Sequence, residues 1–158
     1  MDMVQEFLDP DEIGVINAGG LALGVVTDEH REEFGAGDFL LHDVIGADRA
    51  VGAIALDAEI EVGRTVQYHL RDAGAADSDL RLLAAGASAQ SALLFTCNGR
   101  GTRLFGHRHH DASVLADALG EVPLAGMASA GEIGPLAGRN RLLGMSASIA
   151  LFDQSGRG

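Results

Sequence analysis

Two polar, glycine-rich segments in the second half of the chain, residues 98–106 and 131–140, hold the side chains best suited to chemistry. The first directly follows an apolar run that is typical of a buried strand. Its glycines permit a ligand to approach the backbone closely, and Arg100 and Arg103 could each hold a carboxylate or phosphate through paired N–H groups. The alternative is an ordinary turn whose arginines lie in water.

The second segment, GEIGPLAGRN at residues 131–140, places one acid among glycines and a proline. Glu132 could pair with an ammonium group or act as a general base. Together with Arg100 it offers the two opposite charges that an amino acid presents, and Asn98 and Asn140 could orient such a ligand through hydrogen bonds. The alternative for Glu132 is an exposed loop acid without a ligand.

Familiar phosphate and metal motifs do not fit these segments. Residues 99–101 begin a G-x-G pattern, but Leu104 stands where the dinucleotide fingerprint requires its third glycine. The Walker A motif needs a lysine, and the chain contains none. Residues 107–111 (HRHHD) match no zinc spacing and are more typical of a polar loop that enters a capped helix. We therefore expect neither a metal nor a cofactor.

Cys97 is the single cysteine, so an internal disulfide is impossible and a reducing compartment is the simplest expectation. A nucleophilic role would need a nearby base, for which His109 or His110 is the candidate. A cysteine at the end of a strand is more often a small buried hydrophobic residue. Whether the chain is an enzyme therefore stays open, with ligand recognition favoured over catalysis.

The length and net charge of the chain limit the number of domains and the kinds of partner. The 158 residues suffice for one domain, and a net charge of −12 opposes binding to nucleic acid or to an anionic membrane. The first 80 residues carry 18 acids and four arginines, whereas the rest carry five acids and seven arginines. The second half is thus the better place for an anionic ligand. The absence of lysine indicates the coding bias of a high-GC bacterium.

No apolar run reaches the length of a membrane span, and the first residues lack the basic and apolar regions of a signal peptide. We therefore expect a cytoplasmic protein.

The order of apolar and turn-forming residues predicts an α+β fold with a mixed, mostly antiparallel sheet of about seven strands and two or three helices. The predicted strands are residues 21–27, 39–45, 51–56, 65–71, 91–97, 123–128 and 144–152. The first four are short and closely spaced, which favours antiparallel pairing, with a turn at residues 46–49. The predicted helices are residues 73–85 and 111–119, the latter with Asp111 as its N-cap.

With both segments in view, the chain resembles the C-terminal domain of the FIST family. The resemblance is carried by ALLFTCNGRG, PLAG, AGEIGP and GRN in the second half, and by GDFL and VGRTVQYHLRD in the first half. It covers residues 21–153, which leaves residues 1–20 as the remnant of a connection and residues 154–158 as a tail. The resemblance implies a sensory domain of a bacterial signalling protein that binds small ligands such as amino acids. Members in eukaryotic ubiquitin ligases imply a protein-binding role as the alternative.

The chain departs from the family pattern in three places. We expect the partner domain that normally precedes this one to be missing, and the stretch at residues 82–91 is shorter than the helix and loop expected there. Residues 141–145 replace an aromatic residue and a histidine that the family tends to carry. We expect as partners a small ligand and either the missing N-terminal FIST domain or a downstream signalling protein, with pairing to a second copy as a further expectation. The expected ligand-binding residues are Cys97, Asn98, Arg100, Arg103, Glu132 and Asn140.

Overall fold

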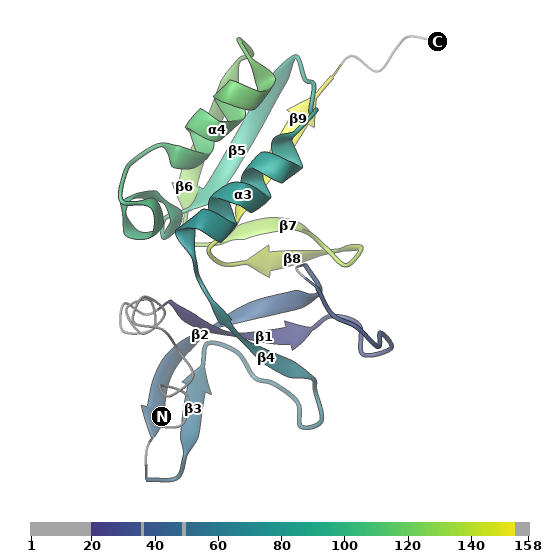
Figure 1. Cartoon of the computed structure of the whole chain (residues 1–158), viewed down its shortest axis with the longest axis vertical. Helices are drawn as coiled ribbons and strands as arrows, with labels where there is room; N and C mark the ends of the chain where they lie inside the picture. The colour runs from purple at the N-terminus through teal and green to yellow at the C-terminus, as the bar shows by residue number, and fades with distance from the viewer. Residues whose placement is uncertain (1–19, 36, 49, 154–158) are drawn as a thin grey trace. The chain divides into compact units, whose positions relative to one another are not determined.

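The computed structural model describes residues 20–35, 37–48 and 50–153, which form two compact units (Figure 1). The first unit consists of Met1–Asp72 with Pro135–Arg139, and the second of Ala73–Gly134 with Asn140–Gly158. The predicted connection at residues 1–20 lies outside the described residues except for Gly20, and the predicted tail at residues 154–158 lies outside them entirely.

The first unit is built on a four-stranded antiparallel sheet in the order β3-β2-β1-β4. Its strands are β1 (Leu21–Val26), β2 (Phe39–Asp48), β3 (Ala53–Leu56) and β4 (Val66–Leu70). The central strand β1 is almost continuously apolar, and its side chains from Ala22 to Val26 are buried. The predicted antiparallel pairing is confirmed. The predicted turn at residues 46–49 is wrong, because β2 continues to Asp48 through a bulge beside β3.

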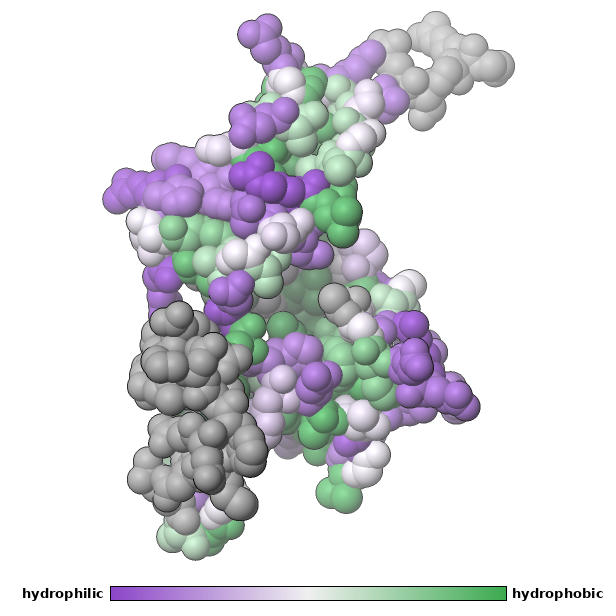
Figure 2. Space-filling model, in the orientation of Figure 1, coloured by the Kyte–Doolittle hydropathy of each residue, from purple (hydrophilic) through white to green (hydrophobic). Residues whose placement is uncertain are grey.

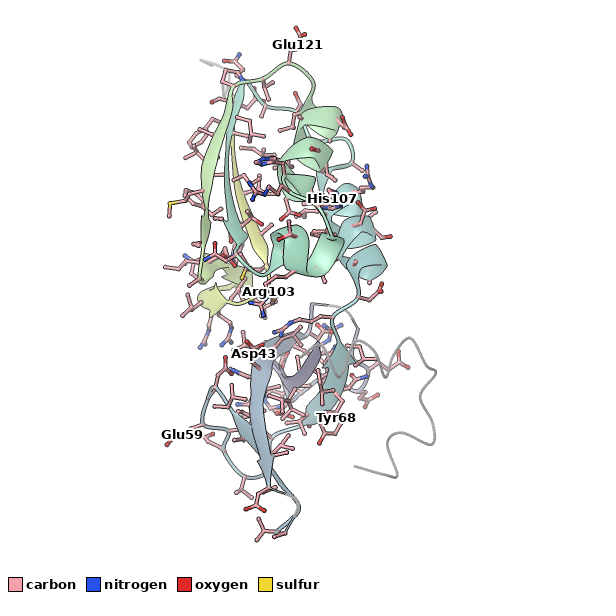
Figure 3. The ribbon with its side chains drawn as sticks, turned by 90° about the vertical axis from the view of Figure 1, so that its left-hand side faces the viewer. Asp43, Glu59, Tyr68, Arg103, His107 and Glu121 are labelled. Carbon is pink, nitrogen blue, oxygen red and sulfur yellow. The ribbon has the colours of Figure 1, made fainter. Side chains whose placement is uncertain are left out.

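The second unit is built on a three-stranded sheet in the order β6-β5-β9. Strand β5 (Ser91–Cys97) is parallel to β6 (Leu124–Ser129) and antiparallel to β9 (Ala147–Phe152). Helices α3 (Ala73–Ala84) and α4 (His110–Leu119) lie together on one face of this sheet, as Figure 3 shows from the side. Because β5 and β6 are parallel, the chain needs the α4 crossover to return to the same end of the sheet.

The core of the second unit lies between this sheet and the two helices. Ala84 of α3, Leu94 of β5 and Leu115 of α4 are buried together, and partly buried apolar side chains from β6 and β9 pack against them. Gly126 allows the close approach of β6 to β5, because a Cβ atom there would collide with the carbonyl oxygen of Leu94. Leu80 and Ala84 of α3 are buried, whereas Leu83, which lies at helical spacing from Leu80, is 67% exposed.

The α+β class is confirmed, with the nine strands of the described residues divided among three sheets. The third sheet is a hairpin of β7 (Glu132–Leu136) and β8 (Arg139–Leu143), which occupies the segment predicted as a loop. Ala137 and Gly138, both with positive φ, make its tight turn. The other polar segment contains an irregular helical turn, η1 (Arg100–Phe105). Figure 2 shows a hydrophilic surface over the connection from η1 to α4.

Candidate functional site

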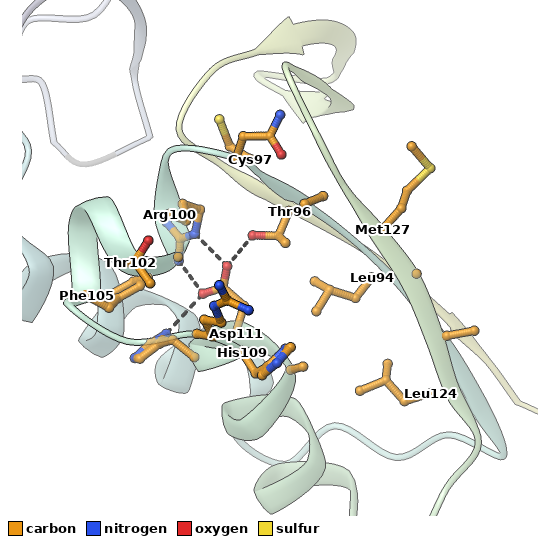
Figure 4. A pocket seen from close by; sticks show the side chains of 18 residues that line it. Leu94, Thr96, Cys97, Arg100, Thr102, Phe105, His109, Asp111, Leu124 and Met127 are labelled. Atoms are coloured by element: carbon orange, nitrogen blue, oxygen red, sulfur yellow. Dashed lines mark hydrogen bonds and ion pairs between the residues drawn. The ribbon is translucent and has the colours of Figure 1, made fainter.

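A cavity of about 520 Å³ lies in the second unit, where β5 and β6 face η1 and the start of α4 (Figure 4). Its apolar wall includes Leu94 and Leu124 from the sheet and Ala112 from α4. Its polar wall includes Thr96, Cys97, Asn98, Arg100, Thr102, Arg108, His109, His110 and Asp111. The cavity reaches the carboxyl ends of two parallel strands, a position where ligands commonly bind in α/β arrangements.

The local sequence explains why polar side chains meet at this position. Strand β5 alternates, so that Leu94 and Thr96 lie on the face covered by the helices. Helix α4 begins with His109 as its N-cap in a left-handed conformation (φ 62°), and no side chain caps the helix. The predicted N-cap role of Asp111 is therefore wrong. Its carboxylate, on the first turn of α4, instead binds side chains from β5 and η1.

The Arg100–Asp111 ion pair is buried in the wall of the cavity. Arg100 Nε donates to Asp111 Oδ2 at 2.8 Å and Arg100 Nη2 donates to Oδ1 at 2.9 Å, which is a bidentate geometry. The two residues are 7% and 5% exposed. The hydroxyl of Thr96 also donates to Oδ2, and Arg100 Nη1 donates to the carbonyl oxygen of Met145 at 3.3 Å. Figure 4 shows the Arg100 and Thr96 side chains converging on Asp111.

This pairing fixes the charge of Asp111. Burial by itself disfavours a charged carboxylate, but hydrogen bonds from Arg100, Thr96 and His110 outweigh that effect. They hold the pKa of Asp111 below its ordinary value of 3.8. The carboxylate is therefore ionised at neutral pH and compensated by Arg100. The guanidinium of Arg100 is in turn occupied by Asp111 and by the carbonyl oxygen of Met145.

His110 extends the network from α4 to α3. Its Nδ1 lies 3.1 Å from Asp111 Oδ1 and its Nε2 lies 2.8 Å from Asp77 Oδ1, so both ring nitrogens face carboxylate oxygens. Asp77 also accepts from Arg81 one turn later, and this hydrogen bond is the main cause of the lowered pKa of Asp77. No local pattern could predict this pairing, because Asp77 and His110 are 33 residues apart.

Phe105 of η1 is held between the two basic residues of this network. Its ring is stacked on the His110 imidazole, with centroids 3.5 Å apart and an angle of 10° between the planes. The Arg100 guanidinium carbon lies 5.2 Å from the Phe105 centroid, within cation–π range. These contacts fix η1 against α4 and shape one side of the cavity.

Cys97 and Asn98, two of the residues predicted to bind a ligand, also line the cavity. The Cys97 side chain is buried, and its Sγ accepts a weak hydrogen bond from the Gly99 N–H at 3.5 Å. Of the two histidines considered as its base, His110 points both ring nitrogens at carboxylates, whereas the His109 ring has no hydrogen bond to the described residues. Asn98 is exposed, and its backbone N–H donates to the Ser129 carbonyl oxygen.

The other three predicted site residues lie outside the cavity wall. Glu132 is 2% exposed, and its two carboxylate oxygens accept hydrogen bonds from the hydroxyls of Ser129 and Ser146 at 2.9 and 2.8 Å. Arg103 on η1 and Asn140 on β8 are exposed. The structure thus gathers Cys97, Asn98 and Arg100 at one cavity. It adds Thr96, Asp111 and His110, which the sequence analysis did not assign to a ligand site.

The described residues contain no group of three or more His, Cys, Asp or Glu side chains arranged to hold a metal ion. None of their helices is long and apolar enough to cross a membrane.

The chain is similar to uncharacterized mycobacterial proteins along most of its length. It is 50% identical over 155 residues to the uncharacterized protein Mb0898c of Mycobacterium bovis, a match that covers 94% of the chain and 40% of that relative. It is 52% identical over 149 residues to the uncharacterized protein Rv0628c of Mycobacterium tuberculosis, which covers 90% of the chain and 39% of the relative. The chain therefore spans about 40% of the length of these curated relatives.

No solved structure matches the chain. The family described as the FIST C domain matches residues 1–135, which is most of the sequence. The mycobacterial relatives agree with the high-GC bacterial origin that the arginine-only composition indicated. The chain therefore belongs to the FIST C domain family.

Proposed function

We propose that this chain is a small-ligand-binding sensory domain of a bacterial signalling protein, and that the cavity beside η1 is its ligand site. The observation that carries the proposal is the cavity itself, since about 520 Å³ lies in the range of small-molecule sites. Domains of this family are generally sensory, which supports the same assignment. The paired network around Asp111 would keep the wall of the site rigid.

The ligand class to test first is an amino acid or a similar zwitterion, as the sequence suggested. A thermal-shift screen of the chain against free amino acids and related metabolites is the direct experiment. A compound present at 100 times its Kd should stabilise the fold by roughly 2.7 kcal/mol. The absence of any stabilising compound would contradict the ligand-binding proposal.

A matched pair of variants tests whether the cavity is the site. Ala112 lines the cavity, whereas Ala118 is exposed on the same helix. Ala112→Leu should fill part of the cavity and abolish the ligand-dependent shift, and Ala118→Leu should leave it unchanged. If both variants respond to the ligand as the unaltered chain does, the ligand binds elsewhere.

A second candidate function, docking of a partner protein, is favoured by the sheet face that points away from the helices. Phe95 and Met127 are neighbours on this face across β5 and β6, and Phe152 of β9 shares it. Their exposed fractions are 36%, 60% and 50%, which is unusual for three large apolar side chains on one surface.

The partner would be the N-terminal FIST domain, a downstream signalling protein or a second copy of the chain. Light scattering at several concentrations separates the last of these from the others. A concentration-dependent mass that Met127→Ser abolishes would support self-association. A constant monomer mass would exclude it.

A further inference from the structure

The charged groups of the cavity wall are not equally available to a ligand. The one acid among the described residues of the wall is Asp111. Its Oδ1 faces Arg100 and His110, and its Oδ2 accepts from Arg100 and Thr96. A ligand ammonium that entered the cavity would therefore lose its water without gaining a free carboxylate, which is costly.

A positive charge in the cavity wall, that of Arg108, is available to a ligand. Arg108 and His109 line the cavity, and both residues are exposed. Neither side chain has a hydrogen bond or ion pair to any residue that the structure describes. The planar Arg108 guanidinium can pair with a carboxylate through two parallel N–H groups, and the His109 ring can add a further hydrogen bond.

The rest of the wall suits an aliphatic body. Leu94, Leu124, Ala112 and Ala128 present carbon to the cavity, and Gly126 adds a stretch of bare backbone. A branched hydrocarbon chain placed there would leave water for an apolar wall, which is favourable by about 25 cal/mol for each Å² buried.

We infer that the cavity binds a small aliphatic carboxylate through Arg108 and His109, and that it makes no use of an ammonium group. This inference rests on the proposed function, because it specifies the ligand class for the same cavity. It separates two features that an amino acid carries together. The cavity recognises the carboxylate and the apolar side chain of such a ligand, and it does not recognise the α-amino group.

Three compounds that share the same branched hydrocarbon chain test this inference by calorimetric titration of the protein. Leucine carries both charges, 4-methylpentanoate lacks the amino group, and 3-methylbutylamine lacks the carboxylate. We expect 4-methylpentanoate to bind at least as tightly as leucine and the amine to give no heat of binding. Binding of the acid should also weaken when the salt concentration is raised.

Variants in the same segment locate the contact. Arg108→Gln should weaken binding of 4-methylpentanoate about tenfold or more, because it removes a charge-assisted hydrogen bond. His109→Asn should weaken it less, and asparagine tolerates the left-handed conformation of this position. Arg103→Gln is the matched control, since Arg103 is an exposed arginine outside the cavity wall, and it should leave the affinity unchanged.

The outcomes distinguish this inference from the proposed function. If leucine binds at the cavity and 4-methylpentanoate does not, the ammonium is recognised and the inference is wrong, while the sensory proposal stands. If none of the three binds but another metabolite stabilises the chain and Ala112→Leu abolishes the effect, the inference is again wrong and the sensory proposal stands. If no compound of either set binds, both are wrong. Equal loss of affinity in Arg108→Gln and Arg103→Gln would also overturn the inference.

Discussion

Two buried acids in the second unit are stabilised in different ways. Asp111 is held by a bidentate arginine, a threonine hydroxyl and a histidine ring. Glu132 is held by two serine hydroxyls, from Ser129 and Ser146, and no salt bridge reaches it among the described residues. The charge of Asp111 is compensated by a cation, whereas Glu132 accepts hydrogen bonds from neutral donors.

This difference shows why the sequence alone does not tell whether a charged side chain is available to a ligand or is already paired within the protein. Arg100 and Glu132 appeared to be a complementary pair for a zwitterion. Each instead satisfies a neighbour within its own part of the fold: Arg100 pairs with Asp111, and Glu132 accepts from serines. The basic side chains of the cavity wall without a partner among the described residues are Arg108 and His109, in a stretch that the sequence analysis took for an ordinary polar loop.

Removing the cation from the first acid should have the largest effect. Arg100→Met would leave Asp111 buried and unpaired, which we expect to cost about 3–5 kcal/mol of stability in urea unfolding. Arg103→Met, on the exposed side of η1, should cost less than about 0.5 kcal/mol. Adding Asp111→Leu to Arg100→Met should recover part of the loss. A double variant that is no more stable than Arg100→Met would show that the uncompensated charge is not the cause.

Removing one neutral donor from the second acid should have an intermediate effect. Ser146→Ala takes away the hydroxyl that donates to Glu132 Oε2 at 2.8 Å. Leaving that buried oxygen unsatisfied should cost about 1–3 kcal/mol, measured by thermal or urea unfolding. Ser88→Ala provides the control, because Ser88 is exposed and should tolerate the change. Equal stability of the two variants would mean that water replaces the missing hydroxyl.

The smallest expected effect is a change in how stability depends on pH in the acid range. Folding lowers the pKa of Asp111 below 3.8, so its ionised form stabilises the fold above pH 3.8. This contribution is lost as the pH falls through the folded pKa. Thr96→Val removes one of the donors that lower the pKa, so the variant should lose less stability than the unaltered chain between pH 5 and the folded pKa. The unfolding free energies of Thr96→Val and of the unaltered chain should therefore converge as the pH falls through this range. Parallel curves of free energy against pH would contradict the prediction.

The elements with strong periodic patterns were predictable from sequence. Strands β5 and β9 are mostly apolar and β4 alternates, so each was found within a few residues. Strand β7 was missed because Gly134 and Pro135 are residues that normally end a strand. Helical spacing alone did not separate Leu83, which is exposed, from Leu80 and Ala84, which are buried.

The candidate site was less predictable, because its contacts join distant positions. The CNGRG pattern lies at the end of β5, where Cys97, Asn98 and Arg100 line the cavity, and their role in ligand binding stays a prediction. Asp111 had the signature of an N-cap, and only the fold brings it to Arg100, 11 residues away, and to Thr96. No local pattern distinguishes an arginine with a buried partner from one that is free.

The stacked ring of Phe105 has a practical consequence for spectroscopy. The chain contains no tryptophan, so its intrinsic fluorescence has no indole background. Phe105 contacts His110 and Arg100 and also lines the cavity. A single Phe105→Trp replacement would therefore place the chain's sole indole emitter at the cavity wall, where a change in emission would follow its occupancy in real time.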